Sequence, residues 1–330
     1  RHVGGPASFQ EKFTEGLKKH GISVTENLNS FAYDAVLVIG GTRQLGGLWR
    51  AKQRGIQIVQ RLNGMNWLHK KRNTGLKHYI KAEYSNFLLS FIRKNLANVI
   101  VYQSQFAKNW WDREYGEINT PSQIVHNAVD LDIYTHKGKD DRPKNKHRLL
   151  LVEGRLGGGY EMGLEVAVKL AEQLQNENKL LIELMIAGQV DEKIKSNWQA
   201  QTNVPLVWAG LVPKERIPQL DRSAHILYSA DINAACPNSV IEAMACGLPI
   251  LAFDTGALPE LVTGKAGEIV PYGGDPWALD PPDIVRLAEA AVKMINNQSK
   301  YRENARQRAE KDLGLDIMVT AYLRALSLVN

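Results

Sequence analysis

Residues 224–252, with the sequence AHILYSADINAACPNSVIEAMACGLPILA, contain a complete strand–helix–strand unit. The short apolar runs at its two ends, residues 224–228 and 249–252, are typical of buried strands. Between them, Ser239 and Glu242 stand three residues apart in the register of a capping box, so we expect a helix to begin at Ser239. Strands joined by a helix form parallel sheets with right-handed crossovers, and this stretch therefore predicts an α/β fold.

The same alternation of strands and helices runs through the chain twice. In the first half we expect strands at residues 35–39, 56–59, 99–102 and 123–125, and helices near 6–20, 45–54, 77–96 and 104–115. In the second half we expect strands at residues 148–153, 180–187, 204–209, 224–228, 249–252 and 267–270, with an amphipathic helix at 163–176. Residues 137–146 are charged and almost free of apolar side chains, which indicates a linker between two domains.

Composition and charge exclude some classes of protein and indicate the kind of partner. The 330 residues are 44% hydrophobic and 23% charged, which excludes a disordered protein. No apolar run approaches the ~18–20 residues of a membrane-spanning helix. Residues 1–148 carry 24 Lys and Arg against 12 Asp and Glu, which leaves 17 against 23 for the rest of the chain. The basic first half indicates an anionic partner: a nucleic acid, an anionic bilayer surface or a phosphorylated substrate.

Two glycine-rich turns mark places where backbone amides can approach a ligand. Gly4 and Gly5 stand directly before the first expected helix. Residues 153–159, EGRLGGG, lead from a strand into a helix, and within them Arg155 offers a fork-shaped cation. The sequence Gly-x-x-x-x-Gly-Lys-[Ser/Thr] is absent, so this turn is not expected to be the P-loop of an NTPase.

The helix expected after Ser239 offers a second site for an anion. Its free amides, near Val240 and Ile241, face outward from a strand end, and together with the helix dipole they suit a phosphate group. The residues alone leave two interpretations of Glu242 open: it caps its own helix, or it binds a ligand.

Several short motifs occur in the order and spacing of one enzyme family. In the second half they are Gly154-Arg155-Leu156, Ala187-Gly188, Trp208-Ala209-Gly210, residues 237–247, and DTGALPELV at residues 254–262. In the first half they are Gly4-Gly5-Pro6, VYQSQF at residues 101–106, and IVHNAVD at residues 124–130. On these motifs the chain resembles the family 4 glycosyltransferases of the GT-B fold, and the resemblance covers nearly the whole chain.

The resemblance implies a fold and an activity. The implied fold is α/β, with two Rossmann-like parallel-sheet domains facing a cleft: an acceptor-binding domain at residues 1–147, a nucleotide-sugar-binding domain at 148–312, and a terminal helix at 313–330 that crosses back to the first domain. The implied activity is retaining transfer of a sugar from a nucleoside-diphosphate sugar, of the UDP or GDP type, to a polysaccharide, glycolipid or other glycoconjugate acceptor. Neither a metal nor a cofactor is expected, because cations and helix amides stabilise the leaving diphosphate.

The resemblance also implies site residues. Those expected to bind the donor are Gly4, Gly5, Arg155, Asn238, Ser239, Val240, Ile241, Glu242 and Leu211. Among them Arg155 and the amides of Val240 and Ile241 would hold the diphosphate, Glu242 would hold the ribose hydroxyls, and Leu211 would lie near the base.

The sequence departs from the family at two positions. Met162 stands where the family usually has a lysine that binds the diphosphate, and Ala234 stands where many members have a glutamate that contacts the donor sugar. Loss of a cation beside a leaving diphosphate weakens catalysis unless another group replaces it. A second hypothesis is therefore a catalytically impaired relative that binds nucleotide or glycan as a partner subunit. A third is a nucleotide-sugar epimerase of the same architecture.

The first half offers further candidates for catalysis. Arg61 and Asn63 lie at the carboxyl end of the strand expected at residues 56–59, where a ligand-binding cleft belongs. Together with Arg155 they are the expected catalytic residues. His69 comes several residues later, and it is interpreted either as a site residue or as a surface histidine.

The helix expected at residues 77–96 carries aromatic side chains and has basic clusters at both ends. One interpretation is a core helix with solvated basic ends, and the other is a peripheral contact with the inner face of a membrane. No recognition motif for nucleic acid accompanies the charge, so nucleic acid is not an expected partner. Cys236 and Cys246 are expected to be buried thiols in a reducing compartment, which favours a cytoplasmic location.

Overall fold

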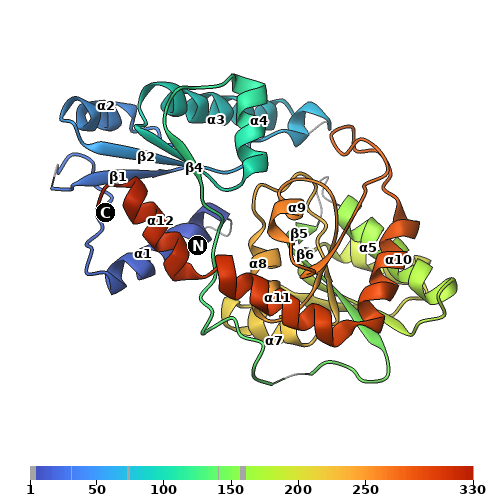
Figure 1. The fold of residues 1–330 in the computed structure, drawn as a ribbon. Helices are drawn as coiled ribbons and strands as arrows, with labels where there is room; N and C mark the ends of the chain where they lie inside the picture. The colour runs from blue at the N-terminus through green and yellow to red at the C-terminus, as the bar shows by residue number, and fades with distance from the viewer. Residues whose placement is uncertain (1–4, 31, 73–74, 140, 157–160, 330) are drawn as a thin grey trace. The chain divides into compact units, whose positions relative to one another are not determined.

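The computed structural model describes residues 5–30, 32–72, 75–139, 141–156 and 161–329. The chain forms two compact units: unit 1 consists of Arg1–Ala128 with Leu315–Asn330, and unit 2 consists of Val129–Gly314. Each unit is built on one parallel sheet that has helices on both faces (Figure 1). The α/β architecture expected from the sequence is therefore present twice.

The sheet of unit 1 has four parallel strands in the order β1-β2-β3-β4. They are β1 (Ala35–Ile39), β2 (Gln57–Leu62), β3 (Val99–Tyr102) and β4 (Ser122–Ile124). The helices are α1 (Gly5–Lys19), α2 (Leu45–Gln53), α3 (Leu76–Asn95), α4 (Gln105–Tyr115) and α12 (Leu315–Ala325), with a short 3-10 helix η1 (Leu68–Lys70). Strand β1 forms one edge of the sheet, and a cavity of about 690 Å³ lies along it.

Helices cover both faces of this sheet. Helices α2 and α3 pack on the face that carries Val36 and Ile58, whereas α1 and α12 pack on the face that carries Val59 and Val101. Figure 1 shows α4 next to α3, on the side of the sheet opposite α1 and α12. Because both faces are covered, β1 and β3 consist of apolar and aromatic residues, as parallel strands do, whereas β2 and β4 also contain polar residues.

The last helix of the sequence completes the core of unit 1. Phe9 and Phe13 of α1 form a cluster with Tyr322 of α12, in which the ring centroids lie 5.1 to 5.4 Å apart. Beside them, a Cβ atom at Gly16 would lie within 2.4 Å of the side chain of Val319, so the glycine permits the two helices to approach closely. The core of the first unit therefore contains the end of the chain.

A buried charged cluster joins α3, α4 and β3. The guanidinium group of Arg93 is fully buried, pairs with Asp112, and donates hydrogen bonds to the Tyr102 hydroxyl at 2.7 Å and to the Gly116 carbonyl oxygen at 2.9 Å. Lys108 pairs with the other carboxylate oxygen of Asp112 at 2.7 Å. These partners compensate the cost of burying the Arg93 cation.

The sheet of unit 2 has six parallel strands in the order β10-β9-β8-β5-β6-β7. They are β5 (His147–Leu156), β6 (Ile182–Val190), β7 (Leu206–Gly210), β8 (Ile226–Tyr228), β9 (Ile250–Phe253) and β10 (Gly267–Val270). The helices are α5 (Met162–Asn176), α6 (Glu192–Gln201), α7 (Ile217–Arg222), α8 (Asn238–Ala245), α9 (Leu258–Leu261), α10 (Ile284–Asn296) and α11 (Gln298–Asp312), with a 3-10 helix η2 (Lys214–Arg216). All six strands expected from the second half of the sequence are present.

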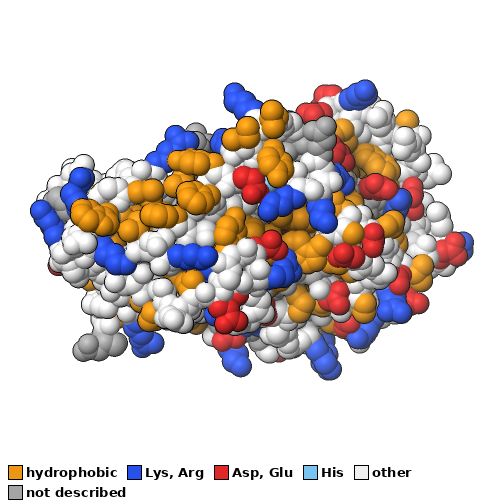
Figure 2. Space-filling model, turned by 90° about the horizontal axis from the view of Figure 1, so that it is seen from above, with side chains coloured by type: hydrophobic (Ala, Val, Ile, Leu, Met, Phe, Trp, Pro, Cys, Tyr) orange, Lys and Arg blue, Asp and Glu red, His pale blue; other side chains and the backbone are white. Residues whose placement is uncertain are grey.

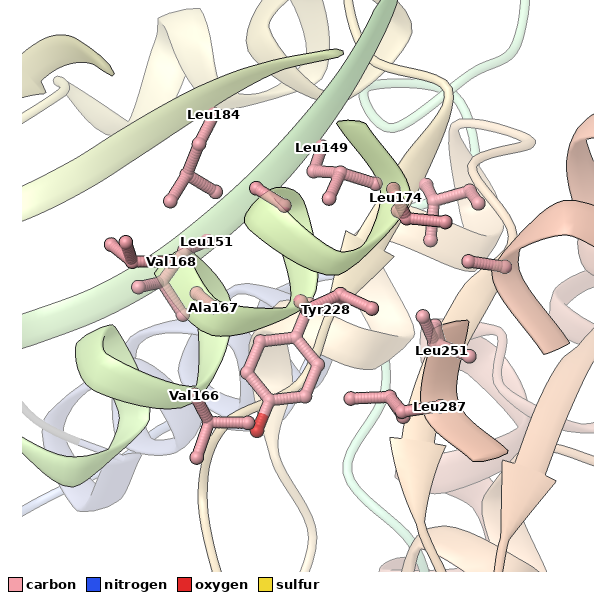
Figure 3. Packing of buried hydrophobic residues seen from close by; sticks show 14 of the residues in the cluster. Leu149, Leu151, Val166, Ala167, Val168, Leu174, Leu184, Tyr228, Leu251 and Leu287 are labelled. Carbon is pink, nitrogen blue, oxygen red and sulfur yellow. The ribbon is translucent and has the colours of Figure 1, made fainter. Parts of the chain in front are cut away.

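The hydrophobic core of unit 2 lies between its sheet and the helices α5 and α10. Figure 3 shows Leu149 and Leu151 of β5 packed with Val168 and Leu174 of α5, and Leu287 of α10 belongs to the same cluster. Helices α7, α8 and α11 form a separate layer, in which α8 contacts the other two (Figure 1). In the part of the chain that the structure describes, none of the helices is both long and apolar enough to cross a bilayer.

The predicted domain boundaries at residues 147 and 312 differ from those observed. The polar stretch predicted as a linker belongs to unit 2, where an arginine and a glutamine of that unit hold it. Arg222 donates a hydrogen bond to the Lys139 carbonyl oxygen at 3.1 Å, and the side-chain amide of Gln219 donates one to an Asp141 carboxylate oxygen at 2.7 Å. The chain passes between the units just before Val129 and again just after Gly314.

Candidate functional site

The switch point of the unit 2 sheet lies between β5 and β8. From β5 the chain continues to β6 and β7 on one side, and it then returns to place β8, β9 and β10 on the other. In open parallel sheets, ligands bind at the carboxyl ends of the two strands that flank such a point. The loops that follow β5 and β8 are therefore the first place to look for a binding site.

The end of β5 is reshaped by a bulge. Its register against β6 shifts between Val152 and Arg155. Opposite the bulge, Gly188 of β6 has a φ of +146°, and a Cβ atom at this position would lie 2.1 Å from the Glu153 carbonyl oxygen. Bulges redirect side chains at strand ends, and here the side chain of Arg155 is exposed at the switch point.

Helix α8 begins differently from the sequence-based expectation. It starts at Asn238, with Pro237 as the N-cap residue, and this cap makes no side-chain hydrogen bond. The prediction that the helix begins at Ser239 in a capping box is therefore wrong by one residue. Proline has no side-chain acceptor that could cap the first-turn amides, and amides at a helix N-terminus favour an anion.

Two buried side chains hold the first turn of α8 in place. Val240 and Ile241 are buried in the core, whereas Asn238, Ser239 and Glu242 are half-buried. Since α8 follows β8 and leads back to the parallel strand β9, its N-terminus lies at the carboxyl edge of the sheet. The fold therefore brings Arg155 and the first turn of α8 to one edge of unit 2.

The loop between β8 and α8 is pinned by the loop after β9. Ala257 donates a backbone hydrogen bond to the Ala234 carbonyl oxygen at 2.8 Å. Gly256 has a φ of +59°, and a Cβ atom there would lie 2.5 Å from the backbone of Ala234. Ala234 itself is buried beneath this contact. The close approach fixes the path of the chain that leads into the first turn of α8.

Two carboxyl groups flank the switch point. Glu153 ends the regular part of β5, and Asp231 follows β8, the neighbouring strand. The surrounding protein atoms raise the pKa of both groups above the ordinary carboxyl range, and the nearby charge of Asp231 adds to the shift in the pKa of Glu153. With its pKa raised to about 8, Glu153 stays protonated at neutral pH and does not repel an approaching phosphate, whereas Asp231, with its pKa raised to about 6, is largely ionised there.

A third carboxyl group, that of Asp221, lies near Glu242. Asp221 of α7 is buried, and its Oδ2 atom has no hydrogen-bond partner among the residues that the structure describes. Burial raises the pKa of Asp221 well above its usual range, and the charge of Glu242 raises it further, while a hydrogen bond from the Cys246 thiol acts in the opposite direction. Asp221 is therefore expected to be neutral in the folded protein over a pH range in which it is ionised in the unfolded chain.

This shift predicts a pH-dependent stability. Because the pKa of Asp221 is higher in the folded state, the folded state should lose stability as pH rises above the ordinary carboxyl pKa of about 4. The variant Asp221→Asn, which is neutral at every pH, should lose less stability between about pH 5 and about pH 8. Thermal unfolding of both proteins across this range measures the difference. If the melting temperatures of the two proteins change with pH in the same way, the pKa of Asp221 is not raised in the folded state.

Leu211 lies apart from the side chains at the switch point. It directly follows β7, an edge strand, and its side chain is 67% exposed. The backbone turns sharply before it, since Gly210 has a φ of +65°. Leu211 is thus exposed at the carboxyl end of a strand, where a contact with the nucleotide base is possible. That contact stays a prediction.

The remaining site candidates belong to unit 1. Gly4 lies outside the described residues, and Gly5 is the first residue of α1, with open space where a Cβ atom would be. Asn63 follows β2, and its carbonyl oxygen accepts a hydrogen bond from the Trp111 indole at 2.7 Å. His69 is buried rather than at the surface, with its Nε2 atom 2.6 Å from a Glu83 carboxylate oxygen.

Arg61 does not have the exposure expected of a catalytic residue. It lies within β2 and is 1% exposed. Its guanidinium group is 4.0 Å from the ring centroid of Phe9 and donates a hydrogen bond to the Asn127 side chain at 2.9 Å. Sequence spacing placed Arg61 at a strand end, but its direction into the core could not be read from spacing. A side chain so enclosed contributes to the core of unit 1, and the catalytic role of Arg61 stays a prediction.

Sequence reasoning missed several groups that shape the site. It did not single out Asp221 or Asp231, and it quoted Gly188 only as part of a motif. The position of Asp231 just after an expected strand could have drawn attention to it, because strand ends meet at the ligand-binding edge. No feature of the sequence marks Asp221 in this way, because the helix that carries it, α7, was not predicted.

The fold defines a protein with two parallel α/β domains, the second of which has a switch point lined by an arginine and the N-terminus of a helix. Residues 136–312 match the family described as glycosyl transferases group 1, and the chain belongs to this family. A curated relative, the alpha-maltose-1-phosphate synthase of Mycolicibacterium smegmatis, is 29% identical over 121 residues, which are 36% of this chain and 30% of that protein. The match thus spans less than a third of that relative.

Solved structures confirm the expected GT-B fold. The sucrose-phosphate synthase of Thermosynechococcus elongatus superimposes with a TM-score of 0.68 at 15% identity, over 99% of this chain and 81% of that one. HepE of Anabaena, in a complex with UDP-glucose, superimposes with a TM-score of 0.68 at 14% identity, over 99% of this chain and 97% of that one. The resemblance inferred from the motifs is therefore confirmed at the level of family and fold.

Proposed function

We propose that this protein is a retaining glycosyltransferase that moves a sugar from a nucleoside-diphosphate sugar to a polysaccharide, glycolipid or other glycoconjugate acceptor. The observation that carries the proposal is that Arg155 and the first turn of α8 lie at the same edge of the unit 2 sheet, at its switch point. An arginine and helix amides can stabilise the negative charge that develops on a leaving diphosphate.

The carboxyl groups near this point fit the proposal. Glu242 stands on the first turn of α8, where its half-buried carboxylate can accept hydrogen bonds from ribose hydroxyls. The raised pKa of Glu153 keeps a carboxyl neutral close to where the phosphates would lie. In this proposal, Arg155 and the α8 amides take the place of a metal ion, and no cofactor is required.

UDP is the first nucleotide to test, and the cytoplasm is the proposed location. The related fold of HepE of Anabaena was solved with UDP-glucose, which supports a donor of the UDP type, with GDP as the other expectation. Cys236 and Cys246 are buried and form no disulfide in the part of the chain that the structure describes, which supports a reducing compartment.

A second candidate is an impaired relative that binds nucleotide or glycan as a partner subunit. Met162 is the first residue of α5, and its side chain packs against the hydrophobic core of unit 2. It supplies no charge where the family resemblance implies a lysine. Ala234 is likewise buried and supplies no carboxylate. These two positions favour the second candidate if the donor site binds without turnover.

Calorimetric titration with UDP, GDP, ADP and TDP tests the donor site. We expect one nucleotide to bind, and we expect Arg155→Ala or Glu242→Ala to weaken its binding by about tenfold or more, because each removes a charge-assisted hydrogen bond. Arg286→Ala is a matched control, since Arg286 is an exposed arginine of α10. Unchanged affinity in both site variants would refute the assignment of the donor site.

Turnover separates the two candidates. A transferase should release nucleoside diphosphate slowly from its donor alone and faster with an acceptor. A binding subunit should bind the nucleotide and release nothing, whereas an epimerase should interconvert nucleotide sugars without any acceptor. For a transferase, the anomeric configuration of the product tests whether the reaction retains that of the donor.

A further inference from the structure

The exposed face of α3 in unit 1 is apolar. Five large apolar side chains lie along it at spacings of three and four residues, so that they form one continuous stripe. They are Leu76, Ile80, Tyr84, Phe87 and Phe91, and their exposure ranges from 37% for Phe91 to 75% for Leu76. From first to last residue, this α3 stripe is about 22 Å long. A helix that packs on a sheet normally presents polar side chains to water on this face.

The opposite face of α3 packs against the rest of unit 1. Ala82, Leu89 and Ile92 are buried against unit 1, and Asn86 is held by hydrogen bonds with Asn66. The stripe is therefore not needed for the packing of α3 on its own sheet. Contiguous exposed apolar surface on this scale marks an interaction site.

Basic side chains border the α3 stripe. Lys77, Lys81 and Lys94 are exposed on the same helix. The single acidic residue of α3, Glu83, is paired with His69 at 2.6 Å and with Lys70 at 3.4 Å. Figure 2, which looks onto the side of unit 1 that carries α2, α3 and α4, shows blue and orange side chains close together on its left half.

We propose that the α3 stripe inserts into the interface of an anionic lipid bilayer, with Lys77, Lys81 and Lys94 contacting the lipid headgroups. A helix that lies in a membrane surface combines an apolar face with basic residues beside it, and its apolar side chains enter the boundary between headgroups and acyl chains. Each lysine near an anionic surface adds attraction that falls with ionic strength.

Charge favours a bilayer over a second copy of this chain. A symmetric dimer through α3 would bring the same surface of both copies together, so that its lysines would face the lysines of the partner. An anionic membrane instead neutralises all of them. Insertion does not depend on the donor site, so a protein that binds no nucleotide can still bind vesicles.

Cosedimentation with vesicles tests the proposal. The full chain should bind vesicles of equimolar phosphatidylcholine and phosphatidylglycerol more tightly than vesicles of phosphatidylcholine alone. The triple variant Leu76→Gln, Ile80→Gln and Phe87→Gln should lower the partition coefficient at least about tenfold, because its exposed apolar groups no longer enter the bilayer. The double variant Lys77→Gln and Lys81→Gln should lower it about fivefold per lysine at low salt.

Leu181→Gln is the matched control. Leu181 is 69% exposed but lies in unit 2, so its loss should leave vesicle binding unchanged. All substituted side chains are exposed, and unchanged circular dichroism and melting temperature would show that the variants fold. Wild-type vesicle binding by the folded triple variant would overturn the proposal. So would the absence of vesicle binding together with a concentration-dependent dimer that the triple variant abolishes, which would assign the stripe to a second copy.

Discussion

Replacing Gly188 by alanine is expected to destabilise unit 2 by at least about 3 kcal/mol, because two separate costs add. The added Cβ atom would lie 2.1 Å from the Glu153 carbonyl oxygen, and the backbone of Gly188 has a φ of +146°, which L side chains rarely adopt. Relief of the clash requires β5 and β6 to move apart at the bulge that directs Arg155. Nucleotide binding should therefore weaken together with stability.

Gly154→Ala is the matched control for this prediction. Gly154 lies in the same bulge, but nothing lies within 4 Å of the position of its Cβ atom. Differential scanning calorimetry of the two variants measures stability, and calorimetric titration measures nucleotide binding. If Gly188→Ala unfolds at the same temperature as Gly154→Ala, the two strands do not approach each other as closely as the structure shows.

Replacing Arg93 by alanine is expected to destabilise unit 1 by about 3–5 kcal/mol. The change removes a fully buried cation and leaves the Tyr102 hydroxyl and the Gly116 carbonyl oxygen without their donor. It also removes one of the two cations that pair with Asp112. Denaturant unfolding followed by circular dichroism measures the loss of stability.

Lys108→Ala provides the comparison. Lys108 binds the same carboxylate, Asp112, but its own side chain is 35% exposed. Its loss should cost about 1 kcal/mol or less, as for other surface ion pairs. Equal costs for Arg93→Ala and Lys108→Ala would mean that burial does not decide the strength of this cluster.

The strands of both sheets could be predicted because parallel strands are marked by local sequence. Short runs such as AVLVI at Ala35–Ile39 are apolar on both faces, and helices separate them. The positions of Arg155 and of the first turn of α8 followed from strand ends and from short motifs. They could be predicted because a strand end, a glycine-rich turn and a helix start are all local features.

Other features depend on contacts between distant parts of the chain, which local sequence does not encode. Residues 137–146 have the composition of a linker, but a hydrogen bond from Gln219 to Asp141 helps to hold them on unit 2. The depth at which Arg61 lies depends on α1, since it is enclosed by Phe9. The start of α8 was missed because Pro237, with a φ of −71°, takes the N-cap position, although it cannot form the predicted capping box.

The place of α12 has a consequence for how the protein is made. Unit 2 is one continuous segment, and the pairing of Val129 with Gly314 brings its two ends together, so this segment contains all that its own folding requires. Unit 1 lacks Tyr322 and Val319 until the ribosome has added α12, and until then part of the apolar side of α1 has no cover. Of the two units, the one whose synthesis begins first therefore completes its core last, and its apolar surface stays exposed to aggregation until then.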